Sequence, residues 1–238
     1  MRSVALALLA LSLAAPASAQ TVVAPGDPSL DTSHITAGQR RFVVRLTSPM
    51  RQDIGTFTET ITVDGARVTR ASLLDVPMGG QLQRDSSVAV LAGLVPVFSS
   101  TSRTGAGPAG SEETTFMGDH AMTRVTTGLT TVDSTVALAA PVFGAGWASE
   151  IVRALPLAAG YSAAWTSLDA ADGPGQSTAT VTGSESVQTP AGPVEAWTVT
   201  VVRDGRTNTY AIAKASRDML AMRFAPQPGA TVEVVPAP

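Results

Sequence analysis

Residues 56–74 read TFTETITVDGARVTRASLL and carry the clearest structural signal in the chain. In the first eight positions threonines alternate strictly with phenylalanine, glutamate, isoleucine and valine. Such alternation in β-branched and aromatic residues is typical of a strand with one buried face. The Asp64-Gly65 pair that follows favours a two-residue hairpin turn. The stretch therefore predicts an antiparallel hairpin whose return strand covers residues 67–74.

The same pattern recurs toward the C-terminus. Residues 194–202 and 206–213 flank another Asp-Gly pair, and further strands are expected at 219–224 and 230–235. Shorter strands are expected at 114–117, 121–127, 132–138, 177–182 and 184–188. The chain is therefore expected to form an antiparallel β-meander.

One helix interrupts this pattern. Large apolar residues recur at a spacing of four between two prolines, at Phe143, Trp147, Ile151 and Leu155. This spacing predicts a short helix with one apolar face, which must cover an apolar surface. The expected fold class is mostly β: a meander forming an open (unclosed) or half β-barrel with one short helix packed on it.

The N-terminus has the three parts of a secretory signal. Arg2 precedes an apolar run over residues 4–15, and Ala17-Ser18-Ala19 fits the small-residue cleavage rule. The run is shorter than the roughly 20 residues of a membrane-spanning helix. The chain contains no cysteine, which excludes disulfides and a lipid anchor built on cysteine. We expect cleavage after Ala19 and a periplasmic or extracellular protein that is neither lipid-anchored nor membrane-spanning.

Three regions are expected after this reasoning: the signal over 1–19, an extended N-terminal arm over 20–40, and a single β domain over 41–238. The arm is polar and contains proline and glycine, which favour irregular structure. The chain carries 16 basic and 19 acidic residues, so nucleic acid is not an expected partner. A monomer is expected.

No arrangement of residues indicates catalysis, a cofactor or a metal. Residues 105–110 match G-x-G-x-x-G, but the sequence that follows reads as a strand and not as the helix of a dinucleotide site. His34 and His120 are distant and lack cysteine partners, so they do not form a metal site alone. Two carboxylates could serve a glycosidase, but the sequence places no two of them face to face. The candidate carboxylates are those of Glu59, Glu150, Glu185, Glu195 and Glu233. We therefore expect no enzyme.

Ligand binding is the remaining possibility. A β-barrel too wide to fill itself leaves an apolar cavity, which large side chains would line. The candidate ligand-binding residues are Phe143, Trp147, Ile151, Tyr161, Trp165, Trp197 and Tyr210. Most aromatic residues are also expected in the core.

Residues 181–199 read VTGSESVQTPAGPVEAWTV, and residues 155–161 read LPLAAGY. These segments resemble a group of uncharacterised exported bacterial β proteins with a Thr-Pro-x-Gly…Ala-Trp signature. That group is similar in fold to periplasmic lipoprotein carriers of the LolA/LolB type, which are unclosed β-barrels with helices over the mouth. The resemblance implies this fold and a lipid- or lipoprotein-binding role, and it implies no catalytic residue.

Two functions follow as expectations. The first is a non-enzymatic, carrier-like exported protein that binds an apolar small molecule, a lipid or a lipoprotein. The second is a cell-envelope assembly module that binds another protein through a sheet edge.

Overall fold

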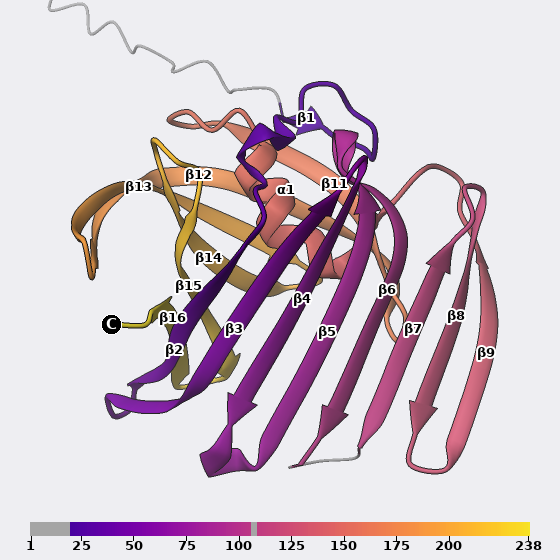
Figure 1. Ribbon diagram of the computed structural model, residues 1–238, viewed down its shortest axis with the longest axis horizontal. Helices are drawn as coiled ribbons and strands as arrows, with labels where there is room; N and C mark the ends of the chain where they lie inside the picture. The colour runs from indigo at the N-terminus through magenta and orange to yellow at the C-terminus, as the bar shows by residue number, and fades with distance from the viewer. Residues whose placement is uncertain (1–19, 106–108) are drawn as a thin grey trace, which may run out of the picture.

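The computed structural model describes residues 20–105 and 109–238 (Figure 1). The expected signal over 1–19 lies outside the described residues. Within them, one sheet of sixteen strands dominates the molecule. The strands are β1 (Thr21–Val22), β2 (Gly38–Ser48), β3 (Gln52–Asp64), β4 (Arg67–Val76), β5 (Gln81–Val90), β6 (Val95–Thr104), β7 (Gly110–Phe116), β8 (His120–Thr127), β9 (Thr130–Ala137), β10 (Phe143–Gly144), β11 (Ser162–Asp169), β12 (Gly173–Thr189), β13 (Gly192–Arg203), β14 (Arg206–Ala213), β15 (Met219–Gln227) and β16 (Ala230–Pro236).

The sheet consists of two meanders that join at one pair of strands. Strands β2–β9 pair in sequence, strands β11–β16 do the same, and β16 pairs with β2. These pairs are all antiparallel, whereas β1 and β10 run parallel to β11. Strands β9 and β11 do not pair with each other, so the sheet stays open. The expected fold class, an unclosed and mostly β structure, is confirmed.

The hairpins form where the sequence predicts them. Asp64-Gly65 turns β3 into β4, and Phe57 lies opposite Leu74 in that pair. The segments expected as two short strands at 177–182 and 184–188 form the single strand β12. Its register shifts at a bulge between Val181 and Gly183, and a glycine inside a strand often marks such a bulge.

The helix α1 (Ala148–Ala154) is shorter than the spacing predicts. Phe143 lies in β10, and Trp147 ends the 3₁₀ turn η4 (Ala145–Trp147). The glycines between them disfavour a longer helix. Figure 1 shows α1 inside the curve of the sheet, where it covers part of the concave face. The main core includes Phe143, Trp147, Ile151 and Leu155, all buried.

The segment before β2, residues 20–37, lies on the sheet and is called the N-terminal lead below. Thr21 pairs with Ala163 of β11, and the backbone N–H of Gly26 donates to the carbonyl of Gly93 at 2.8 Å. The lead also contains the 3₁₀ turn η1 (Thr32–His34). Its apolar side chains enter the main core, namely Val23, Leu30 and Ile35. Burial of these side chains gives the lead a fixed place before β2 begins at Gly38. Two further 3₁₀ turns are η2 (Pro77–Gly79) and η3 (Ala92–Leu94).

Candidate functional site

Polar side chains form two rows across strands β4–β7. The register places Arg70, Ser87, Ser99 and Thr114 side by side on neighbouring strands. The second row, two residues along each strand, contains Ser72, Asp85, Thr101 and Glu112. Residues two apart on a strand share one face of the sheet. Because Arg70 contacts Glu150 of α1, both rows lie on the concave face.

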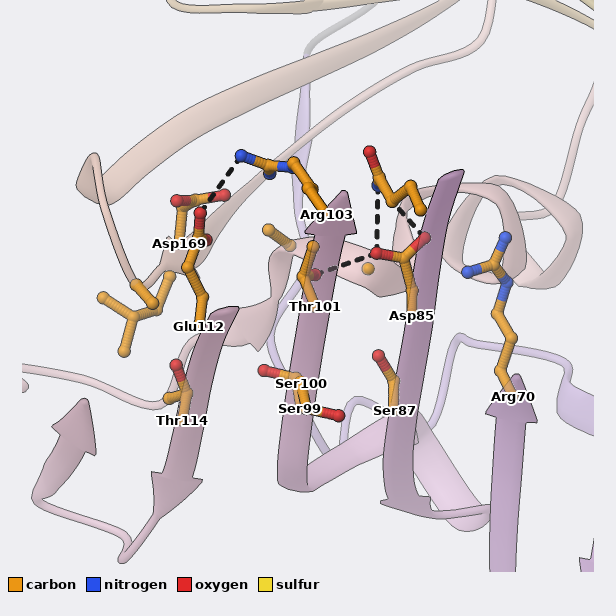
Figure 2. A pocket seen from close by; sticks show the side chains of 15 residues that line it. Arg70, Asp85, Ser87, Ser99, Ser100, Thr101, Arg103, Glu112, Thr114 and Asp169 are labelled. Carbon is orange, nitrogen blue, oxygen red and sulfur yellow. Dashed lines mark hydrogen bonds and ion pairs between the residues drawn. The ribbon is translucent and has the colours of Figure 1, made fainter. Parts of the chain in front are cut away.

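These rows line a cleft of about 220 Å³ (Figure 2). Its opposite wall comes from η4 and from the end of β11. That wall includes Ala145, Gly146, Leu168 and Asp169. A second cleft of about 250 Å³ shares Ala145 and Asp169 with the first, and is lined by the ends of β11–β14. The part of the concave face beyond the helix is therefore open and polar.

The first row holds hydroxyl groups without partners. Ser87 and Thr114 are each only 2 % exposed, and Ser99 is half-buried. None of these side chains forms a hydrogen bond with another described residue. The Ser87 hydroxyl lies close to Gly146 of η4, where an added Cβ would be 2.7 Å from its oxygen. The three hydroxyls of Ser87, Ser99 and Thr114 thus keep unused hydrogen-bonding capacity along the cleft.

The second row holds charges that already have partners. The carboxylate of Asp85 accepts hydrogen bonds from Thr101 at 2.8 Å, from Gln83 at 3.0 Å and from Ser72 at 3.0 Å. Beside them, the ion pair of Arg103 with Glu112 measures 3.2 Å. Figure 2 shows the contacts of Asp85 with Thr101 and of Arg103 with Glu112 above the row of Ser87, Ser99 and Thr114.

The pKa of Glu112 is shifted by the same surroundings. Burial raises this pKa. The positive charge of Arg103 lowers it, whereas the negative charges of Asp169 and Asp172 raise it further, so the pKa is raised overall. Glu112 is thus a carboxyl group that takes up a proton more readily than an exposed glutamate.

Arg70 connects the cleft to a buried group of charges behind it. Its Nε donates to Oε1 of Glu59 at 2.7 Å and lies 3.2 Å from Oε2 of Glu150. Ser149 donates to the same Glu150 oxygen at 2.6 Å. Burial lowers the pKa of Arg70, but Glu150 and Glu59 outweigh burial and raise this pKa overall. Arg70 therefore stays charged, and its partners fix it at the end of the cleft.

Burial also acts on Glu150, which is fully enclosed. Burial raises the pKa of Glu150. The positive charge of Arg70 opposes this shift, and the negative charge of Glu59 adds to it. On the same helix, Arg153 donates to the carbonyl oxygens of Arg217 at 2.8 Å and of His34 at 2.7 Å. These contacts join α1 to the N-terminal lead and to the connection before β15.

The residues predicted to bind an apolar ligand gather in one place, the main core. Five of them are buried, namely Phe143, Trp147, Ile151, Trp165 and Tyr210. Tyr161 and Trp197 are partly buried and pack against the same core. Burial raises the pKa of Tyr210 to about 12. None of these residues lines the polar cleft, and their role as ligand contacts stays a prediction.

The structure pairs several of the scattered carboxylates. Glu59 and Glu150 meet at Arg70, and Glu185 and Glu233 meet at Arg223, where each contact measures 2.8 Å. One signal in the sequence pointed to the first pair. Strand alternation places Glu59 on the face of Phe57 and Ile61, and a charge among inward apolar residues needs a partner.

The hydroxyl row was missed by sequence reasoning. In β5 and β6, serines and threonines occupy successive positions, as in Ser86-Ser87 and Ser99-Ser100-Thr101. Polar residues then fall on both faces, so the alternation that identifies an inward face is absent. Only the pairing with β4 and β7 shows which hydroxyls face the helix.

Within the described residues, neither histidine lines the cleft or belongs to a group of metal ligands. His34 lies 3.1 Å from Asp31, and His120 lies 2.7 Å from Asp119 at a turn. In the described part of the chain, no group of three His, Cys, Asp or Glu side chains is placed to hold a metal. Strands β6 and β7 flank the segment at 105–110, of which 106–108 lie outside the described residues.

One further property concerns membranes. Among residues 20–105 and 109–238, no helix is both long and apolar enough to cross a bilayer.

A solved structure shares the fold. The crystal structure of a β-barrel-like protein of the domain of unknown function DUF1849 from Brucella abortus has a TM-score of 0.57 and 10% sequence identity, and the match covers 85% of this chain and 96% of that chain. At this identity the likeness concerns the fold alone. Among curated proteins, none matches the sequence.

The comparisons support the resemblance to a family of uncharacterised β proteins. The Thr-Pro-x-Gly signature and the likeness to lipoprotein carriers stay predictions. The profile of DUF3108, a family of proteins of unknown function, matches residues 33–235. Because this match spans most of the chain, the protein belongs to the DUF3108 family.

Proposed function

We propose that this protein is a non-enzymatic, exported binding protein of the carrier type, and that its ligand lies in the cleft on the concave face of the open sheet. One observation carries the proposal: the hydroxyls of Ser87, Ser99 and Thr114, which form no hydrogen bond with another described residue, line a cleft that the helix leaves uncovered. Concave sites with a few converging polar groups are the usual places for small ligands.

The cleft suits the ligand better than the core does. An apolar ligand or the acyl chain of a lipoprotein, as expected from the sequence, needs space between large apolar side chains. Trp147 and Trp165 occupy that space, each almost fully buried. We therefore place the ligand against the polar rows. Binding of an acyl chain in the core is the competing result, which experiment must exclude.

The carboxylates of the cleft favour binding over catalysis. A general acid or base must reach the substrate with a free oxygen or proton. Asp85 accepts hydrogen bonds from three neighbouring side chains, and Glu112 pairs with Arg103. Both groups are thus engaged in holding the cleft in shape, and the third carboxylate, Asp169, accepts hydrogen bonds from the backbone N–H groups of Ala171 and Asp172.

The edge of the sheet supports a second candidate function, the binding of another protein in the cell envelope. Strand β9 ends the sheet, and its outer edge has unpaired backbone groups. Nearly all of its residues are exposed, Val132 at 57%. The strand contains neither lysine nor proline, which commonly protect such edges. An extended segment of a partner could add there as a further strand.

Native mass spectrometry of the purified protein tests the first proposal. The protein is incubated with the lipid fraction and with the water-soluble fraction of a cell-envelope extract. In a Ser99→Trp variant the new side chain fills the cleft, whereas in Ser102→Trp the same change lies on the opposite face of β6. We expect a saturable adduct in the wild type and in Ser102→Trp, and its loss in Ser99→Trp. Equal adducts in all three proteins, or none in any, would refute the proposal.

A further inference from the structure

We infer that the cleft takes a neutral, hydroxyl-rich unit, such as a sugar or a sugar alcohol. The inference rests on the proposed function and names the chemical class of its ligand. It is carried by the row of free hydroxyls and by the pairing of the charges around that row.

The hydroxyl row has a regular geometry. Ser87 lies opposite Ser99, and Ser99 opposite Thr114, on adjacent antiparallel strands. Neighbouring strands are about 4.8 Å apart, so the three hydroxyls span about 10 Å. Figure 2 shows them in line along the cleft, below the row that contains Asp85 and Glu112.

The chemistry of hydroxyls restricts what this row prefers. Each serine or threonine hydroxyl donates one hydrogen bond and can accept two. A carboxylate or phosphate ligand only accepts, and an ammonium group only donates. A ligand with several hydroxyls of its own both donates and accepts at every position, so it matches the row without leaving an unpaired group.

The charges of the cleft disfavour an anionic ligand. Arg103 is paired with Glu112, and Arg70 is held by Glu59 and Glu150. Asp85 receives its hydrogen bonds from neutral side chains and keeps its negative charge. An anionic ligand would lose its hydration without gaining a cation that lacks a carboxylate partner, which is costly in an enclosed site.

The size and the far wall of the cleft agree with this class. A volume of about 220 Å³ corresponds to about seven water molecules at about 30 Å³ each. Ala145 and Gly146 of η4 supply an uncharged part of the lining, whereas Leu168 is almost fully buried with Ala121 and Val142. A sugar ring presents hydroxyls at its rim and carbon–hydrogen bonds on its faces, so it can contact both the hydroxyls and η4. The neighbouring second cleft leaves space for further units.

The ligand class is tested by titration of the full protein, followed by calorimetry and by amide NMR spectra. Probes are neutral methyl glycosides and sugar alcohols, with the uronic acid of the same ring as the anionic analogue. Short neutral oligosaccharides form a further arm, which distinguishes a free sugar from one unit of a longer glycan. We expect saturable binding of at least one neutral probe, with the uronic acid at least about tenfold weaker, a difference of about 1.4 kcal/mol.

Two variants test whether the ligand contacts the hydroxyl row of Ser87, Ser99 and Thr114. Ser87→Ala and Thr114→Val each remove one hydroxyl, and Ser86→Ala and Thr115→Val make the same changes on the opposite face of the same strands. Each variant on the row should weaken binding about threefold to tenfold, as expected for one neutral hydrogen bond. The two matched controls should bind like the wild type. Amide spectra show directly whether each variant is folded.

The outcomes separate this inference from the proposed function. If the uronic acid binds as tightly as the neutral probe, or both row variants bind like the wild type, the inference is wrong. If no neutral probe binds but the Ser99→Trp variant still loses an envelope adduct, the ligand class is wrong and the binding function stands. If no ligand of any kind perturbs the cleft, both proposals fail.

Discussion

At the scale of single residues, Arg70 is the side chain on which most of the polar interior depends. It is the nearest positive charge to two buried carboxylates, with contacts of 2.7 Å to Glu59 and 3.2 Å to Glu150. Buried ion pairs add little net stability over an apolar equivalent, but the loss of one partner leaves an uncompensated charge. The arginine is therefore required by its neighbours, and it also closes one end of the cleft.

The substitution Arg70→Met tests this dependence. We expect the free energy of unfolding in urea to fall by about 3–5 kcal/mol, because both carboxylates lose their nearest cation and keep only longer contacts, with Arg40 at 3.4 Å and Arg153 at 3.8 Å. Glu150→Gln in the same background should restore part of the loss, since it removes one of the two buried negative charges. The matched control is Arg124→Met, which breaks an exposed pair with Asp133 and should cost far less. Equal losses in the two single variants would contradict the account.

The raised pKa of Glu150 predicts a dependence of stability on pH. The folded protein binds a proton at Glu150 more tightly than the unfolded chain does. Between the ordinary pKa of glutamate and this raised value, the folded state therefore holds more protons, and stability decreases as pH increases. Glu150→Gln should make the decrease in unfolding free energy less steep as pH rises above the ordinary glutamate pKa of about 4.5. The exposed Glu113→Gln serves as control, and an unchanged slope in Glu150→Gln would rule out this assignment.

At the scale of elements, much of the fold could be predicted from local sequence. Strict alternation and the Asp64-Gly65 turn define β3 and β4, because period and turn chemistry agree there. The end of the helix at Pro156 was also signalled, but its start was not. Gly144 and Gly146 delay the helix to Ala148, and the sequence alone does not show how the chain before it pairs. The cleft could not be predicted, because its rows exist only through pairing between strands.

A glycine holds the N-terminal lead against η3. Gly93 has a φ of +68°, and a Cβ at this position would lie 2.4 Å from the Cα of Gly26. Gly93→Ala should destabilise the protein by about 1–3 kcal/mol and increase amide hydrogen exchange over residues 21–35. Gly65→Ala is the matched control, because Gly65 also has a positive φ but no heavy atom near its added Cβ. If both variants leave exchange in the lead unchanged, the lead is not held at this contact.

At the scale of the whole molecule, the open sheet creates both candidate binding surfaces. The unclosed arrangement leaves the polar cleft beyond α1, and it leaves β9 as a free edge. Figure 1 shows β7–β9 extending to one side of the helix. A closed barrel would have neither surface. The family match and the similar fold are consistent with this architecture and leave the ligand to experiment.

The edge of β9 gives a prediction of its own. Val132→Lys places a positive charge on the free edge, as natural sheets do to prevent edge pairing. If a partner adds to this edge, proteins captured from envelope extract by the immobilised wild type should be lost with Val132→Lys. They should be kept with Val202→Lys, which changes an exposed valine on β13, a strand paired on both sides. Equal capture by the two variants, measured by quantitative mass spectrometry, would exclude the edge.

The most direct test of the central claim compares two ligands on one sample by NMR. The labelled protein is titrated with a neutral methyl glycoside and, separately, with a fatty acid. We expect the glycoside to shift the amide signals of Ser87, Ser99 and Thr114, and to leave the indole signals of Trp147 and Trp165 in place. Saturable shifts of both indole signals by the fatty acid, with the three cleft amides unmoved by either ligand, would contradict it.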